Sequence, residues 1–100
     1  MSPVRTVAQS LHEKREEIYR IAAAHGARNL RLFGSHARGD AGPASDVDLL
    51  VDTAGTTSSW FPAGLIVDLE DLLGCHVDVV TEKGLNPLIR ERVLREAVPL

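Results

Sequence analysis

The sequence contains a single cysteine, fewer basic than acidic residues and no long apolar run, and each of these shortages excludes a class of protein. Cys75 has no second cysteine with which to form a disulfide, which indicates a reducing, cytoplasmic setting. The 11 Lys and Arg residues are outnumbered by 14 Asp and Glu, and the net charge of -3 argues against binding to polymeric DNA or RNA. No stretch approaches the roughly 20 apolar residues of a membrane span, and the first residues lack a signal-peptide layout. We therefore expect a cytoplasmic protein that does not enter a membrane.

What is present is the composition of one ordinary domain. The chain has 100 residues, of which 44% are apolar and 25% charged, as in globular proteins. No repeat or low-complexity linker divides it, and the segments near 39–45 and 53–59 are rich in Gly, Pro, Ser and Thr, which is typical of loops. A single domain over 1–100 is expected.

The periodicity of the apolar residues predicts helices alternating with strands. Predicted helices cover 4–25, 61–74 and 86–98, a short helix opens within 34–38, and predicted strands cover 29–33, 45–52 and 75–81. Gly26 and Gly74 are plausible helix ends, while Asn86 and Pro87 form a typical helix start. This order predicts an α/β (α+β) fold in which helices pack over one small mixed sheet.

Two aspartates lie where the chain resembles a buried strand. Asp46 and Asp48 occupy positions i and i+2 and share a face, with roughly 6–7 Å between their Cα atoms. Carboxylates this close repel, and partial burial among valine and leucine makes the unpaired charge costlier. A divalent cation relieves this repulsion, and Mg²⁺ suits such an oxygen-rich site. If the strand bearing Asp78 lies alongside, three carboxylates can hold two Mg²⁺ ions.

The Gly34-Ser35 turn is the candidate phosphate site. Glycine after a strand lets the backbone approach a ligand, and the Ser35 hydroxyl adds a donor, although Ser35 could equally cap the short helix. Arg38 is a candidate charge-assisted contact to phosphate. A structural salt bridge from Arg38 to Asp40 or Asp52 is an open alternative.

Other polar residues receive simpler interpretations. We expect His36 to be an exposed bystander, and His76 to support the site indirectly or be incidental. Asp52 lies about 13 Å beyond Asp48 along an extended strand, so it is excluded from the metal set. Cys75 is expected to be a small buried filler, and Trp60 to belong to the core or to an interface.

The segment "GSHARGDAGPASDVDLLV" (34–51) resembles the signature of nucleotidyltransferases related to the palm of DNA polymerase β. It is most similar to the minimal MNT-type group, whose pattern is G-S, then A-R-G, then S-D-x-D-L. The later "LLGCHVDVVT" (72–81) resembles the strand of that family that carries the third carboxylate, which assigns this role to Asp78. The final "LIRERVLREAVPL" (88–100) resembles the usual last helix, so the likeness extends from Asn29 onward.

This resemblance implies a polymerase β palm-like fold and transfer of a nucleoside monophosphate from an NTP to a hydroxyl, with release of pyrophosphate. It implies catalytic and metal-binding roles for Asp46, Asp48 and Asp78, and nucleotide contacts from Gly34, Ser35 and Arg38. ATP is the expected donor and two Mg²⁺ ions the expected cofactor. Members of the group act as antitoxins of HEPN-domain toxins, some by adding AMP to a tyrosine of the toxin. A non-catalytic module that neutralises a HEPN-type partner by binding is the alternative, and a homodimer is a further possible assembly.

Overall fold

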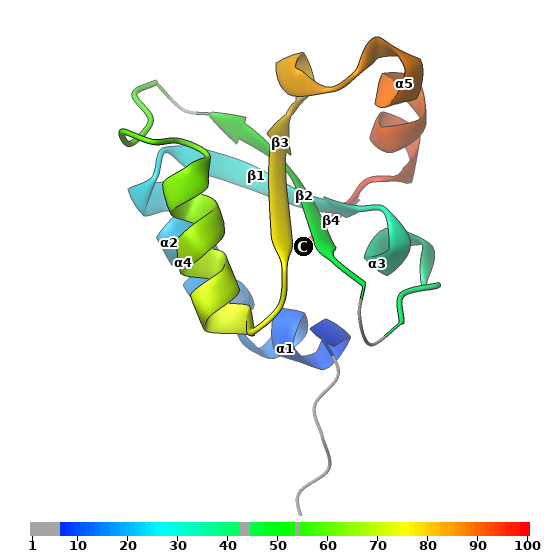
Figure 1. Cartoon of the computed structure of the whole chain (residues 1–100), viewed down its shortest axis with the longest axis horizontal. Helices are drawn as coiled ribbons and strands as arrows, with labels where there is room; N and C mark the ends of the chain where they lie inside the picture. Colours follow the sequence, from blue (N-terminus) through cyan, green and yellow to red (C-terminus); the bar gives the residue numbers. More distant parts are fainter. Residues whose placement is uncertain (1–6, 43–44, 54) are drawn as a thin grey trace, which may run out of the picture.

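The computed structural model describes residues 7–42, 45–53 and 55–100 (Figure 1). The elements in chain order are α1 (Val7–Glu13), α2 (Arg15–Ala24), β1 (Ala27–Phe33), α3 (Ser35–Arg38), β2 (Val47–Thr53), α4 (Ala63–Leu73), β3 (Val77–Thr81), a 3-10 turn η1 (Glu82–Gly84), α5 (Pro87–Glu96) and β4 (Val98–Pro99). No helix in these ranges is long and apolar enough to cross a membrane.

The strands form one mixed sheet, as the sequence led us to expect, and their order is β3-β2-β1-β4. β2 pairs parallel with β3 through the crossover helix α4, whereas β1 runs antiparallel to both β2 and β4. The parallel register sets Asp48 beside Asp78. β4 was not predicted, because a strand of two residues has no detectable periodicity.

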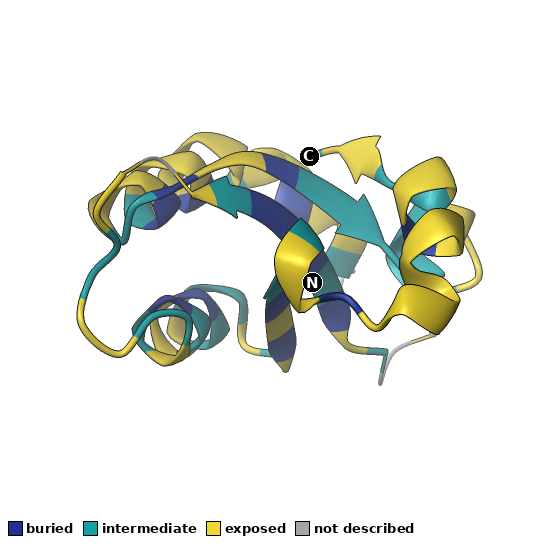
Figure 2. Cartoon of the chain, turned by 90° about the horizontal axis from the view of Figure 1, so that it is seen from above, coloured by how far each residue is buried: buried dark blue, intermediate teal, exposed yellow. Residues whose placement is uncertain are grey.

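Helices α1, α2 and α4 cover one face of the sheet. The main core lies there and takes alternate residues of β2, namely Val47, Leu49 and Val51. The dark blue of buried residues alternates with lighter colours along the strands (Figure 2). This alternation confirms the predicted orientation of β2, because each second side chain points to the opposite face.

The other face is covered at one end only, by η1 and α5. A second cluster forms there from Leu50, Leu85 and Val93, with Phe33 packed against it. Because Leu50 is two residues after Asp48 on the same strand, the aspartate shares the face on which α5 sits. α5 therefore stands beside the aspartate and forms a wall of the site.

The predicted helix 4–25 is wrong in one respect, since it is interrupted at Lys14, and residues 4–6 lie outside the described ranges. The Lys14 Nζ donates to the carbonyl of Leu72 on α4 at 3.0 Å. Leu11, before the break, and Ile18, after it, both enter the core, so the apolar stripe stays in phase. Hydrophobic periodicity does not reveal a break of this kind.

Candidate active site

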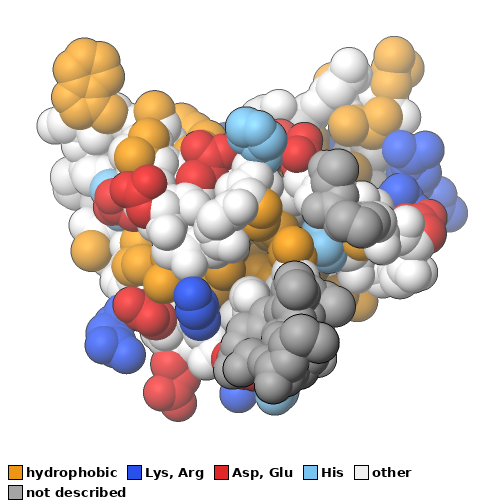
Figure 3. All heavy atoms as spheres, turned by 60° about the horizontal axis from the view of Figure 1, so that its bottom comes forward, with side chains coloured by type: hydrophobic (Ala, Val, Ile, Leu, Met, Phe, Trp, Pro, Cys, Tyr) orange, Lys and Arg blue, Asp and Glu red, His pale blue; other side chains and the backbone are white. Residues whose placement is uncertain are grey.

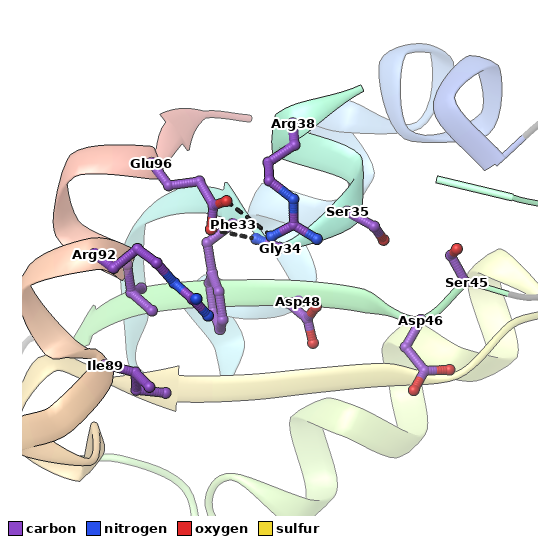
Figure 4. Close-up of a pocket in the computed structure, with 11 residues that line it drawn as sticks. Phe33, Gly34, Ser35, Arg38, Ser45, Asp46, Asp48, Ile89, Arg92 and Glu96 are labelled. Atoms are coloured by element: carbon purple, nitrogen blue, oxygen red, sulfur yellow. Dashed lines mark hydrogen bonds and ion pairs between the residues drawn. The ribbon is translucent and has the colours of Figure 1, made fainter. Parts of the chain in front are cut away.

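A cleft of about 500 Å³ opens between α3 and α5 over the first half of β2 (Figure 4). It is lined by Phe33, Gly34, Ser35, Arg38, Ser45, Asp46, Asp48, Ile89, Arg92, Val93 and Glu96. Five of the six residues proposed from the sequence therefore line one cleft. The sixth, Asp78, does not line it.

Gly34 brings the turn directly against Asp48. Its backbone has φ +75°, a conformation that favours glycine, and a Cβ at this position would collide with the Asp48 Oδ2. The Asp48 Cγ would lie 3.3 Å from that Cβ. The glycine therefore lets the backbone after β1 approach the carboxylate on β2, as expected for a turn that closes on a ligand site.

Asp48 experiences the repulsion that the sequence predicted. Burial, and then the negative charges of Asp78 and Asp46, raise the pKa of the Asp48 carboxyl above its usual range. His36 and Arg38 oppose that shift. Acidic side chains also gather along the hollow between the two raised ends of the molecule (Figure 3). The cleft floor thus carries negative charge that a bound cation would stabilise.

The three carboxylates are close in the fold but are not gathered into a formed metal cage. Asp46 precedes β2 by one residue, not within the strand as predicted, because the ladder starts at Val47. Asp78 is exposed on β3 next to Asp48. Within the described ranges, no three His, Cys, Asp or Glu side chains come together closely enough to hold a metal ion. The donor chemistry of Asp46 and Asp48 nevertheless suits Mg²⁺, which needs only one or two carboxylates when substrate phosphate completes its shell.

Arg38 is held by two acidic side chains. Its Nη1 donates to the Glu96 Oε1 at 2.8 Å, and its Nε donates to the Asp40 Oδ2 at 3.1 Å. The pKa of Arg38 is raised chiefly by the hydrogen bond to Glu96 and then by that to Asp40. Of the two salt bridges that the sequence left open for Arg38, the one to Asp40 is present, and the contact of Arg38 with phosphate stays a prediction. Asp52 instead meets Arg31 at 2.8 Å, on the same sheet but away from this cleft.

Glu96 was missed by the sequence analysis. It is the last residue of α5, and its Oε2 also accepts the N–H of Gly34 at 3.1 Å. The hydrogen bond from Arg38 is the main cause that lowers the pKa of the Glu96 carboxyl. One signal was available in the sequence, because the dipole of a helix disfavours an acidic side chain in its last turn. An acid placed there needs a cationic partner elsewhere in the fold.

The end of the cleft beyond Asp48 is apolar apart from one arginine. Phe33, Ile89 and Val93 form that wall, and Ile89 is 39% exposed. Arg92 comes from the same helix α5, and the described residues give it neither an ion pair nor a hydrogen bond. Figure 4 shows Ile89 and Arg92 at the end of the cleft away from Asp46. This wall could not be predicted from local sequence patterns, because it is created by the docking of α5.

Four other sequence expectations have mixed outcomes. His36 is not an exposed bystander, since its Nε2 is buried and lacks a hydrogen-bond partner among the described residues. His76 is exposed and meets Glu70 at 3.3 Å, outside the cleft. Cys75 is only half-buried, although it packs against the core as expected. Trp60 is 85% exposed, so of its two expected places the core is wrong.

Comparison with known proteins shows the family to which the chain is related. Residues 11–100 match the model of the nucleotidyltransferase domain. Protein adenylyltransferase MntA of Thermococcus cleftensis is 42% identical over 83% of this chain and 92% of its own length. A relative from Methanocaldococcus jannaschii, provisionally named a protein adenylyltransferase, is 36% identical over 89% of this chain and 96% of its own.

Solved structures agree with these relatives. One described provisionally as a minimal nucleotidyltransferase matches 99% of this chain and 100% of its own, with a TM-score of 0.82 and 44% identity. A toxin-antitoxin crystal structure with AMP-PNP matches 87% of this chain and 69% of its own, with a TM-score of 0.69. At 23% identity, that second likeness concerns the fold alone.

Proposed function

Since this chain belongs to the nucleotidyltransferase domain family, we propose that it transfers AMP from ATP to a hydroxyl group on a partner protein. The observation that carries the proposal is a single cleft lined by Asp46, Asp48 and the Gly34-Ser35 turn. A carboxylate pair and a turn with a free hydroxyl are the groups that a metal-chelated triphosphate needs. We treat 1–100 as one domain with this activity.

The cleft has one end suited to each half of a nucleotide. Ser35 and Arg38 line one end, where we propose that they donate to the β- and γ-phosphates; the Ser35 hydroxyl has no partner among the described residues. The apolar wall of Phe33 and Ile89 offers a surface for the nucleoside. Arg92, at the same end as Ile89, adds a second positive charge to the cleft.

Asp46 and Asp48 would hold the metal, with Asp78 on the adjoining strand as the third carboxylate. Two bound Mg²⁺ ions would neutralise the triphosphate and lower the pKa of the acceptor hydroxyl. The acceptor oxygen forms a bond to the α-phosphorus as the bond to the bridging oxygen breaks. The hydroxyl proton passes to water, and pyrophosphate leaves with the electron pair of the broken bond; Ser35 and Arg38 would hold it until release.

The acceptor is proposed to be a helical HEPN-type toxin, with this chain as its cytoplasmic antitoxin. The support is that relatives of this length are named protein adenylyltransferases and that the fold recurs in a toxin-antitoxin structure. The exposed Trp60 is a candidate anchor for the partner, because aromatic side chains dominate binding energy at interfaces. A second copy of this chain is the other candidate partner.

Co-expression with the protein encoded by the neighbouring gene tests this function. We expect the partner to gain the mass of AMP and to lose toxicity, and Asp46→Asn to prevent both. Incubating the purified chain and partner with each NTP in turn, and measuring the mass of the partner, would identify the nucleotide donor. If Asp46→Asn still neutralises an unmodified partner, the chain acts as the non-catalytic binding module instead.

A further inference from the structure

Among the described residues, two of the three guanidinium nitrogens of Arg38 donate hydrogen bonds, and the third does not. Glu96 takes Nη1 and Asp40 takes Nε, while Nη2 has no hydrogen-bond partner within the described residues. In Figure 4 the guanidinium lies between Glu96 and Ser35, at the rim of the cleft. A guanidinium is planar, so fixing two of its nitrogens also fixes the direction of the third.

The two ion pairs of Arg38 differ in strength. The Glu96 side chain is 14% exposed, whereas that of Asp40 is 61% exposed. Ion pairs that water reaches freely contribute little, so Glu96 is the firmer of the two partners. Glu96 also holds the N–H of Gly34 with its second oxygen, and so it ties the arginine and the glycine turn to the end of α5.

We propose that Glu96 is the positioning residue of the nucleotide site: it stays bound to Arg38 and Gly34 and aims the free Arg38 Nη2 at the triphosphate. This inference rests on the proposed function and names the residue that prepares its phosphate end. Glu96 itself touches no substrate, and its effect passes through Arg38. An arginine that is already held in its binding conformation loses less side-chain freedom when it binds phosphate, and the affinity for phosphate is therefore higher.

The opposite role is also physically possible and gives the opposite result. A carboxylate bound to a guanidinium and a backbone N–H occupies groups that could bind phosphate. If Glu96 had to leave before nucleotide entered, its removal would strengthen binding. The direction of the change in affinity therefore separates positioning from competition.

Glu96→Gln is the sharpest variant. Its amide oxygen can still accept from Gly34, but its NH₂ group cannot accept from Arg38. Titration calorimetry with Mg²⁺ would compare the affinity of the full chain for a non-hydrolysable ATP analogue and for inorganic tripolyphosphate. We expect Glu96→Gln to weaken both by about tenfold, because both ligands present phosphate to Arg38. Glu96→Asp should recover part of the loss.

Glu82→Gln is the matched control. Glu82 also pairs with arginines, Arg31 at 3.5 Å and more loosely Arg90 of α5 at 3.9 Å, but it does not line the cleft. Its neutralisation should leave both affinities unchanged. A second comparison uses Arg38→Ala, in which the further change Glu96→Gln should have no additional effect on affinity. Melting curves of all variants verify that each is folded.

The outcomes separate this inference from the function on which it rests. Tighter or unchanged binding in Glu96→Gln would overturn the positioning role while leaving the nucleotide site intact. An equal loss of affinity on Glu96→Gln in the wild-type chain and in the Arg38→Ala background would also overturn it, because Glu96 would then not act through Arg38. If the wild-type chain bound neither ligand, the proposed function would fail and this inference with it.

Discussion

Gly34→Ala offers a quantitative test of how closely the turn approaches Asp48. Gly34 has φ +75° and ψ -152°, a backbone region used almost only by glycine, and a side chain there costs about 1–3 kcal/mol. The added Cβ would also collide with the Asp48 carboxylate, and relief of such overpacking typically costs about 1–3 kcal/mol more. The expected loss of unfolding free energy is therefore about 2–6 kcal/mol.

Gly39→Ala is a control for a glycine with positive φ and no close neighbour. Gly39 has φ +82° and ψ +11°, and a Cβ there would meet nothing within 4 Å. It should lose only the cost of a left-handed residue, about 1–2 kcal/mol. Urea unfolding of both variants, with slopes compared to verify a common unfolding transition, should show the larger loss for Gly34→Ala.

A double variant assigns that difference to one contact. Asp48→Ala removes both carboxylate atoms that the new Cβ would approach and leaves only the Asp48 Cβ, at an ordinary 3.5 Å. In this background Gly34→Ala should lose only its backbone cost, and so less stability than in the wild-type chain. An equal loss in both backgrounds would refute the packing of the turn against Asp48.

Three further variants test the charge, the partner surface and the wall formed by α5. Asp48→Asn should raise the stability of the metal-free protein at neutral pH by about 1 kcal/mol, because it relieves like-charge repulsion, and it should also abolish Mg²⁺-ATP binding. The control Asp52→Asn, which loses an ion pair to Arg31, should not be stabilised. Since the folded pKa of Asp48 is raised, its carboxylate destabilises the fold above that pKa, and the advantage of Asp48→Asn in urea unfolding should shrink as the pH falls through it. Trp60→Ala should leave stability within about 0.5 kcal/mol yet weaken the complex with the partner in sedimentation, since the side chain is exposed; a folded variant with an intact complex would exclude Trp60 as an anchor. Leu50→Ala should cost about 2–5 kcal/mol, because Leu50 is fully buried in the cluster that includes Val93 of α5, and a smaller loss in thermal unfolding would place α5 elsewhere.

Local patterns accounted for most of the architecture. The alternation around Asp48 indicated its strand and its face, and glycine marked helix ends at Gly26 and Gly74, both with positive φ. Asn86 caps α5 as expected, accepting the N–H of Leu88 at 2.9 Å. These features depend on neighbours within a few residues, so a sequence pattern is sufficient to predict them.

The remainder depends on contacts between distant parts of the chain. Glu96 reaches Arg38 across 58 positions, and only the docking of α5 brings them together. The same docking creates the wall that includes Ile89 and Arg92. The burial of the His36 Nε2 likewise depends on tertiary packing, which is why the residue was taken for a bystander.

The most direct test of the account is the fate of the individual phosphates of ATP. The purified chain and its partner would be incubated with Mg²⁺ and ATP labelled either at the α- or at the γ-phosphate, and the label on the partner measured. We expect stable labelling from α-labelled ATP only, and none with Asp46→Asn. Labelling from the γ-phosphate, or no labelling of a partner that binds the chain, would contradict the proposed transfer of AMP.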